Sequence, residues 1–135
     1  MTERELIGAR DPNGFRPLCI GKLNKTTVLA SETCALDIIG AKFVREVQPG
    51  EVVVIGPSGM RSFRPFKEQP AGRSHCLFEH VYFARPDSLV FGESVQAVRV
   101  KLGRELAREH PVDADLVMPI PDSGNFAALG YSLES

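Results

Sequence analysis

The sequence predicts a mixed fold in two parts, an α+β first half followed by an α/β second half. Short apolar runs separated by turn residues fill the first half, as in an antiparallel sheet. The second half has the order strand, helix, strand, helix, which builds a parallel sheet covered by helices. Between them, the polar stretch KEQPAGRS at residues 67–74 contains Pro70 and Gly72, which interrupt regular structure. We therefore expect two domains, at residues 1–73 and 74–135.

The composition is that of an ordinary globular chain. Its 135 residues are 43% hydrophobic and 24% charged, with a formal net charge of -1. Such a balance gives no reason to expect binding to nucleic acid or to an anionic membrane. The basic cluster Arg61, Arg64 and Lys67 is interpreted as a solvated loop. No apolar run reaches the roughly 18 residues of a membrane span, and the first residues lack a signal-peptide pattern, so we expect a cytoplasmic protein.

The first half is predicted to be a set of strands connected by tight turns. A strand at Leu6–Ala9 leads into DPNG at residues 11–14, where Pro12 presets the backbone and Gly14 can take a positive φ. Two apolar runs on either side of Asn24 and Lys25 are predicted to form a hairpin. The expected strands are residues 18–23 and 27–30 for this hairpin, followed by 42–47, 51–55 and 60–63, with GPSG joining the last two.

A short helix is predicted at residues 31–40. Ser31 can accept hydrogen bonds from the free N–H groups at the start of a helix, and Glu32 is favourable in a first turn. Gly40 can take the left-handed conformation that ends a helix. We therefore expect a helix that begins at a serine cap and ends at a glycine.

The second half is predicted to alternate strands with helices. A strand is expected at residues 77–83, a turn at 85–88, and a helix over 94–110 that Pro111 ends. Apolar residues of this helix recur at a spacing of three and four, with basic residues opposite. The stripe comprises Val95, Val98, Leu102 and Leu106, and the basic side comprises Lys101, Arg104 and Arg108. A strand at residues 116–120, a turn at 121–124 and a helix from Asn125 complete this half.

The turn at residues 121–124 is a candidate phosphate-binding site. A strand that feeds a short Asp-Ser-Gly turn into a helix brings free backbone N–H groups to the positive end of the helix. Gly124 would let a phosphate approach the backbone, and Asp122 or Ser123 could offer an oxygen to magnesium carried by it. The alternative is that Asp122 or Ser123 only caps the helix.

The three cysteines do not form a disulfide framework or a zinc pattern. Cys19, Cys34 and Cys76 are an odd number with wide, irregular spacing. Two of them are expected to be ordinary core residues.

Three stretches resemble consecutive parts of the amidophosphoribosyltransferases: ARDPNGFRPL at residues 9–18, CLFEHVYFARPDS at 76–88 and PIPDSG at 119–124. The resemblance runs along essentially the whole chain and marks it as an internal fragment. It implies part of a class II glutaminase sheet of the Ntn type at residues 1–73. Residues 74–135 would hold the interdomain segment and the first strand–helix units of a type I phosphoribosyltransferase domain.

The resemblance also implies a reaction. The intact enzyme would convert glutamine, phosphoribosyl pyrophosphate and water into 5-phosphoribosylamine, glutamate and pyrophosphate, the first step of purine synthesis. Its partners would be these substrates, its cofactor Mg²⁺, and its assembly a homo-oligomer. Some family members also hold a four-iron four-sulfur cluster, for which Cys76 is a candidate ligand; the other interpretation of Cys76 is a free thiol, because such a cluster takes four cysteines.

Carried onto this sequence, the family's site residues fall in two places. Ser123 would hold the magnesium of phosphoribosyl pyrophosphate, with Asp122 and Gly124 beside it as substrate-binding residues. Tyr82 corresponds to an aromatic position of the interdomain ammonia route, and a core tyrosine is the alternative. Arg85 is either an interdomain contact or the partner of a local ion pair with Asp87.

No catalytic residue is expected in this chain. The family's glutaminase uses an N-terminal cysteine, whereas Met1 is followed here by Thr2. Arg10, Asp11 and Arg16 are interpreted as a buried turn network. We therefore expect the isolated chain to be inactive, and two alternatives stay open: a noncatalytic interaction fragment, and a small module that binds magnesium pyrophosphate.

Overall fold

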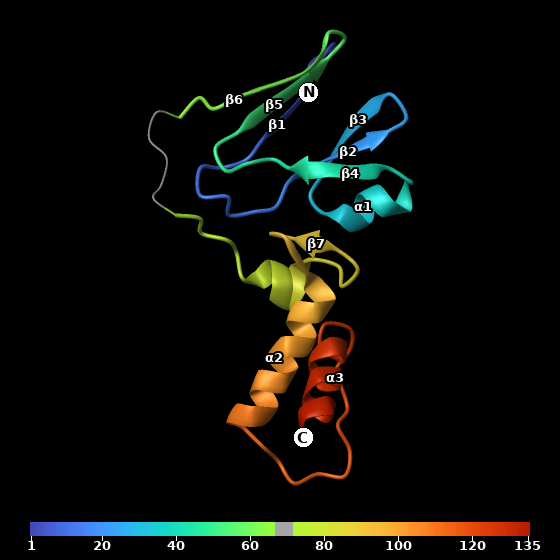
Figure 1. Ribbon diagram of the computed structural model, residues 1–135, viewed down its shortest axis with the longest axis vertical. Coiled ribbons are helices and arrows are strands. Elements are labelled where there is room, and N and C mark those ends of the chain that lie inside the picture. Colours follow the sequence, from blue (N-terminus) through green and yellow to red (C-terminus); the bar gives the residue numbers. More distant parts are fainter. Residues whose placement is uncertain (67–71) are drawn as a thin grey trace. The chain divides into compact units, whose positions relative to one another are not determined.

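The computed structural model describes residues 1–66 and 72–135, and these divide into two compact units (Figure 1). Unit 1 is Met1–Cys76 and unit 2 is Leu77–Ser135, so the division falls close to the boundary predicted between residues 73 and 74. Most of the predicted junction, residues 67–71, lies outside the described residues.

Unit 1 contains two antiparallel sheets of three strands each. One sheet has the order β1-β5-β6 and the other the order β3-β2-β4. The strands are β1 (Leu6–Ala9), β2 (Cys19–Leu23), β3 (Thr26–Ala30), β4 (Lys42–Glu46), β5 (Val52–Gly56) and β6 (Gly59–Phe63). The predicted strands of the first half are confirmed, with ends that differ by one residue or so.

The turns between these strands also follow the sequence. The Gly14 N–H donates to the Asp11 carbonyl at 3.0 Å, and Gly14 has φ +66°. Asn24 lies in the β2–β3 hairpin with φ +53°, a conformation that asparagine adopts more readily than most residues. The basic cluster is only partly a loop: Arg61 lies on β6 and pairs with Glu5 at 2.9 Å, and Lys67 is outside the described residues.

Helix α1 (Thr33–Ile38) forms as predicted but begins differently. Its first flanking residue is Glu32, and no side chain caps it, so the predicted Ser31 cap is wrong. Glu32 therefore precedes the helix and does not occupy its first turn. Gly40 has φ +69° and its N–H donates to the Asp37 carbonyl, so the predicted glycine end is confirmed.

The core of unit 1 is small and lies in two clusters. One comprises Ile20, Val47 and Val53, and the other comprises Cys19, Leu36 and Ala41. Gly21 allows the second cluster to close, because a Cβ there would lie 2.6 Å from a Leu36 methyl carbon. Cys19 and Cys34 are buried, as expected of core cysteines, and neither forms a disulfide within the described residues.

Unit 2 begins with a helical turn where a strand was predicted. Residues 77–83 do not form a strand; Glu79–Phe83 form the single π-helical turn η1, closed by the Ala84 N–H donating to the Glu79 carbonyl at 3.0 Å. An apolar run of this length fits a strand or a short buried helix equally well, because composition does not fix the period. The predicted turn at 85–88 is confirmed by a 3.0 Å hydrogen bond from the Ser88 N–H to the Arg85 carbonyl.

A two-stranded hairpin that the sequence analysis missed follows this turn. Strands β7 (Leu89–Val90) and β8 (Glu93–Ser94) pair across Phe91 and Gly92, which have φ +55° and +85°. Positive φ at both central residues is typical of a tight hairpin turn.

Helices α2 (Val95–Glu109) and α3 (Asn125–Glu134) pack closely against each other (Figure 1). Ser94 caps α2 by accepting from the Ala97 N–H. Glycines make the close approach possible: a Cβ on Gly103 would lie 1.9 Å from the Ala127 carbonyl oxygen, and one on Gly130 would lie 2.0 Å from that of Val100.

The buried side of α2 shares only Val95 with the predicted stripe. Its buried residues are Val95, Arg99, Gly103 and Ala107, at strict four-residue spacing. Leu102 and Leu106 are 43% and 48% exposed. The prediction weighed apolar character and overlooked small size, but helices that touch through backbone atoms require glycine and alanine at the contact.

The predicted strand at residues 116–120 is also wrong. This stretch pairs with no strand among the described residues, and its apolar side chains Leu116, Met118 and Ile120 are 75%, 79% and 85% exposed. The described part of unit 2 therefore has helices and one small hairpin but no parallel sheet. None of the helices within residues 1–66 and 72–135 is both long and apolar enough to cross a bilayer.

Candidate functional site

The turn at residues 121–124 joins the extended stretch 116–120 to α3, as predicted. The Gly124 N–H donates to the Ile120 carbonyl and the Asn125 N–H donates to the Asp122 carbonyl, both at 3.2 Å. Ala128 then makes the first regular helical bond, to the Gly124 carbonyl at 2.9 Å. The turn therefore delivers the chain directly into the helix.

No side chain caps the start of α3. Gly124 is the residue that flanks the helix, and neither Asp122 nor Ser123 makes a capping hydrogen bond. Asp122 is exposed and Ser123 is half-buried. The interpretation of these two residues as simple helix caps is therefore wrong among the described residues.

Gly124 is required by the turn itself. Its φ of −75° is open to any residue, but a Cβ there would lie 2.7 Å from the Ile120 carbonyl oxygen. The close approach that we predicted for a ligand is thus made first by the chain's own backbone.

An apolar groove of about 550 Å³ borders this turn. Its walls come from α2, from α3 and from the extended stretch, and include Leu106, Ile120, Gly124, Ala127 and Tyr131. The Tyr131 hydroxyl donates to the His110 carbonyl at 2.8 Å and so fixes one end of the groove. The candidate site therefore has a polar turn beside an apolar wall.

Tyr82 and its neighbours lie on the exposed side of η1. Tyr82 is 63% exposed, so the alternative of a core tyrosine is wrong. Its ring meets that of Phe83 edge-on at a centroid distance of 5.9 Å, and the Phe83 ring lies 5.8 Å from that of Phe78. An exposed row of three aromatic rings is therefore a feature of this segment.

Arg85 and Asp87 form the local ion pair that was one of the two interpretations. Two hydrogen bonds join them, at 3.1 Å from Nε and 3.0 Å from Nη2. The Arg85 guanidinium holds the pKa of the Asp87 carboxyl below its usual range through these bonds. Both side chains are more than half exposed, so the pair is a surface feature.

Cys76 ends unit 1 as a half-buried free thiol whose backbone N–H donates to the Phe15 carbonyl at 3.0 Å. A four-iron four-sulfur cluster needs four thiolates, so Cys76 does not fit such a cluster alone. No group of three or more His, Cys, Asp or Glu that could hold a metal occurs in the described part of the chain.

The Cys19 thiol is held in its neutral form. Burial raises its pKa to about 11, with a smaller contribution from Glu46.

Arg10 lies at the centre of the predicted turn network in unit 1. Its side chain is 3% exposed, and it pairs with the Glu46 carboxylate at 3.1 Å. The same guanidinium donates to the carbonyls of Val47, Gly14 and Arg16 at 2.7, 3.2 and 3.0 Å. A buried arginine that is shared among four oxygens of its own fold is a structural group, which confirms the interpretation for Arg10. Asp11 and Arg16 belong to the same turn but are exposed, so for them the predicted burial is wrong.

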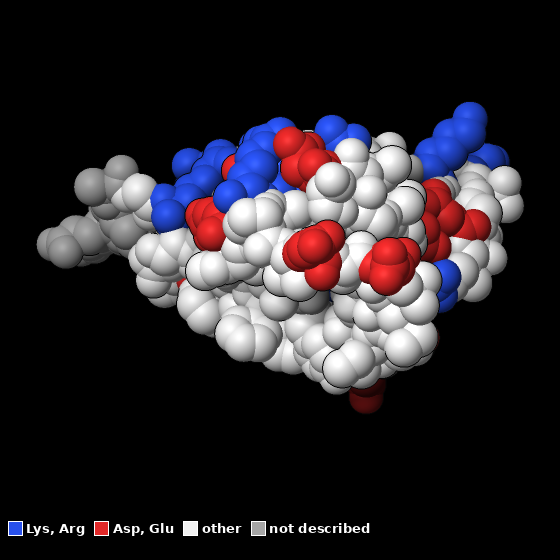
Figure 2. Space-filling model, turned by 90° about the horizontal axis from the view of Figure 1, so that it is seen from below, with Lys and Arg blue, Asp and Glu red and all other residues white. Residues whose placement is uncertain are grey.

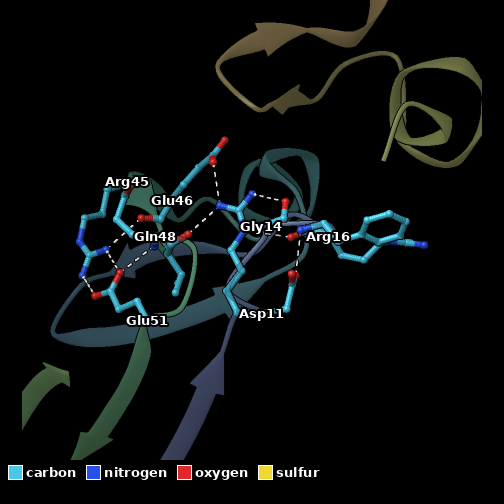
Figure 3. A network of polar contacts seen from close by, with 10 residues as sticks. Asp11, Gly14, Arg16, Arg45, Glu46, Gln48 and Glu51 are labelled. Carbon is cyan, nitrogen blue, oxygen red and sulfur yellow. Dashed lines mark hydrogen bonds and ion pairs between the residues drawn. The ribbon is translucent and has the colours of Figure 1, made fainter. Parts of the chain in front are cut away.

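A second arginine completes the network at the edge of the sheet (Figure 3). Arg45 donates twice to Glu51, at 2.8 and 2.7 Å, and the Gln48 N–H donates to the same carboxylate at 2.7 Å. These bonds, the one from Arg45 foremost, lower the pKa of Glu51 to about 2.

Sequence reasoning missed the buried charged residues of unit 2, Glu79 and Arg99. Arg99 is 4% exposed and donates to the carbonyls of His80 and Ala84. The signal that could have found it is its place four residues after Val95 and four before Gly103, within the side of α2 that packs.

Two solved structures are similar to this chain along essentially its whole length. The structure titled the allosteric regulatory enzyme of purine biosynthesis matches with a TM-score of 0.94 and 48% identity, over 100% of this chain and 29% of that one. Glutamine phosphoribosylpyrophosphate amidotransferase from B. subtilis, complexed with ADP and GMP, matches with a TM-score of 0.93 and 48% identity, over 99% and 29%.

Curated relatives are also similar along the whole chain. Amidophosphoribosyltransferase of Rhizobium etli is 55% identical over 140 residues, which cover 100% of this chain and 28% of the relative. The chloroplastic amidophosphoribosyltransferase of Glycine max is 51% identical over 136 residues, covering 100% and 24%. The chain thus matches one segment of the amidophosphoribosyltransferases along its whole length and spans between about a quarter and a third of these relatives. No family model matches the chain.

Proposed function

We propose that this chain is a segment of an amidophosphoribosyltransferase and contributes part of the site that binds phosphoribosyl pyrophosphate. The observation that carries the proposal is 55% identity to such an enzyme over the full chain. The whole enzyme would release ammonia from glutamine by hydrolysis. The ammonia nitrogen would then bond to the anomeric carbon of phosphoribosyl pyrophosphate as the bond from that carbon to pyrophosphate breaks.

Each unit has a place in this proposal. Residues 1–73 would belong to the glutaminase domain and residues 74–135 to the interdomain segment and the start of the phosphoribosyltransferase domain. The antiparallel sheets of unit 1 and the turn–helix arrangement of unit 2 support this assignment.

In unit 2, the turn before α3 would face the pyrophosphate. Its support is that neither Asp122 nor Ser123 caps α3, so no side chain of the turn occupies the positive end of the helix dipole. Ser123 and Asp122 offer the hard oxygen ligands that Mg²⁺ prefers, which fits a magnesium ion carried by the substrate. Such an ion would neutralise charge on the departing pyrophosphate.

The aromatic row of Phe78, Tyr82 and Phe83, together with Arg85, would lie on the path of ammonia between the two halves. Exposure of Tyr82 supports this role, because a buried core tyrosine could not line a passage. Arg85 would orient the segment through its pair with Asp87. Cys76 would serve as a cluster ligand only with three cysteines from outside this segment.

We further propose that the intact enzyme works as a homo-oligomer with small-molecule substrates and acts in the cytoplasm; in plants its relative is named chloroplastic. Nucleic acid is not expected as a partner. On the face shown in Figure 2, acidic and basic side chains are interspersed along one border and a broad area carries neither, so no single-sign patch appears there.

One observation favours the second candidate function, a noncatalytic interaction fragment. Leu116, Met118 and Ile120 are at least three-quarters exposed in a row of alternating residues. A stretch of this kind would pair with a further strand and be covered by it.

A chimera tests the proposal. Replacing the matching segment of the Rhizobium etli enzyme with these 135 residues should leave glutamine- and phosphoribosyl pyrophosphate-dependent release of glutamate and pyrophosphate within about tenfold of the parent, because 55% identity preserves the packing. The isolated chain should show no turnover. A folded chimera without activity, or turnover by the isolated chain, would contradict the proposal.

A further inference from the structure

Arg99 joins α2 to the helical turn η1. It lies on the packed side of α2 and is 4% exposed. Its Nε donates to the His80 carbonyl at 2.6 Å and its Nη2 donates to the Ala84 carbonyl at 2.9 Å. One planar guanidinium thus binds carbonyls from within η1 and from the residue directly after it.

A helical turn of this length cannot hold its own orientation. Forming one turn fixes several residues for a single hydrogen bond, so short helices depend on tertiary contacts. Here the bond of η1 from the Ala84 N–H to the Glu79 carbonyl is accompanied by the two bonds from Arg99. Bonds from a charged donor are about twice as strong as neutral ones, so Arg99 is the main polar tie between η1 and α2.

A second contact fixes the same side of η1. The His80 ring meets the Phe91 ring edge-on, with centroids 5.8 Å apart, and His80 and Glu79 are both buried. With this side of η1 held, the opposite side is turned outward. Val81, Tyr82 and Phe83 of η1, and Leu77 and Phe78 just before it, are each more than 40% exposed.

We propose that Arg99 is a positioning residue that sets the direction of the aromatic row Phe78, Tyr82 and Phe83, and through it the transfer of ammonia between the two halves of the intact enzyme. The second part rests on the proposed function. Lysine could not replace Arg99 fully, because an ammonium is a compact point charge and lacks the rigid fork that reaches two carbonyls in fixed directions.

Hydrogen exchange of the chain tests the structural part without any activity. Arg99→Gln should speed exchange of the Ala84 amide about tenfold, since two charge-assisted bonds no longer hold η1, and Arg99→Lys should lie between it and the parent. Arg104→Gln, an exposed arginine of the same helix, is the matched control and should change nothing. Unchanged Ala84 exchange in Arg99→Gln would overturn the proposal.

The functional part is tested in the chimera with two nitrogen sources. Added ammonia bypasses the transfer step, so Arg99→Lys should lower the glutamine-dependent rate about tenfold and leave the ammonia-dependent rate within about twofold. A general loss of fold would lower both rates together. Equal loss of both, or loss of neither, would overturn the proposed role in transfer. If the unmutated chimera used neither nitrogen source, the proposed function would fail, and the exchange result would still decide whether Arg99 positions η1.

Discussion

Two aspartate-containing turns of this chain, DPNG at residues 11–14 and PDSG at 121–124, use their side chains in opposite ways. In the first, the Asp11 carboxylate accepts from the backbone N–H groups of Asn13 and Phe15 at 2.9 and 2.8 Å. In the second, neither Asp122 nor Ser123 caps the helix that follows. Similar residues therefore hydrogen-bond to the backbone in the first turn, whereas in the second turn their side-chain oxygens make no capping hydrogen bond.

The comparison teaches that a polar turn becomes a candidate site when its side chains are not needed by its own backbone. Beside the first turn, Arg10 satisfies three carbonyls and one carboxylate of unit 1. Within residues 1–66 and 72–135, no comparable tie holds Asp122, which is exposed just after an extended stretch. Substitutions in the first turn should thus cost stability, whereas those in the second should affect ligand binding.

The largest effect is expected for Arg10→Met. It removes a buried charge and leaves Glu46 and three carbonyls without their donor, which should cost about 3 to 5 kcal/mol of unfolding free energy. Urea unfolding of the chain measures this change. The control Arg64→Met, at an exposed position after β6, should stay within about 0.5 kcal/mol of the parent. A small loss for Arg10→Met would show that this turn, too, is independent of its side chains.

Glu51→Gln should have the next largest effect, about 2 kcal/mol near neutral pH, because it weakens two charge-assisted bonds to Arg45. The pKa of Glu51 is lowered from 4.5 to about 2 in the folded chain. Its stabilisation is therefore complete above pH 4.5 and is lost as the pH falls towards 2. Unfolding free energy measured across this range should fall less steeply in Glu51→Gln, while the exposed control Glu3→Gln should keep the parental slope.

The smallest changes in unfolding free energy are expected for alanine substitutions of the aspartates in the two turns. Asp11→Ala should cost about 1 kcal/mol, because two backbone N–H groups lose a carboxylate acceptor. Asp122→Ala should stay within about 0.5 kcal/mol, since the side chain is exposed and caps nothing. Thermal unfolding of both variants at one pH makes the comparison, and equal losses would remove the distinction between the turns.

Local patterns predicted unit 1 well. The hairpin at Asn24 and the glycines at positions 14 and 40 depend on φ preferences of single residues, which a sequence displays directly. The sequence also predicted that Arg10 belongs to a structural network. It did not predict the partners Glu46 and Val47, because they lie far along the chain and only the folded sheets bring them to Arg10.

Unit 2 was predicted less well, and for physical reasons. The apolar residues 77–83 carry no period that separates a strand from a helical turn, and 116–120 has the composition of a strand but no strand beside it among the described residues. On α2, size decided the packed side, so Gly103 and Ala107 are buried where leucines were expected. The turn before α3 was located correctly, but its uncapped geometry could not be read from residue types that usually cap helices.

The most direct test of whether the turn at residues 121–124 binds substrate is the Michaelis constant for phosphoribosyl pyrophosphate in the chimera. Ser123→Ala should raise it about tenfold at limiting Mg²⁺, because one oxygen near the pyrophosphate is lost, and unfolding free energy should not change. The control is Ser132→Ala on α3, where the hydroxyl donates to the Leu129 carbonyl at 3.0 Å; it should leave the constant unaltered. An unaltered constant in Ser123→Ala would contradict the assignment of this turn to the substrate.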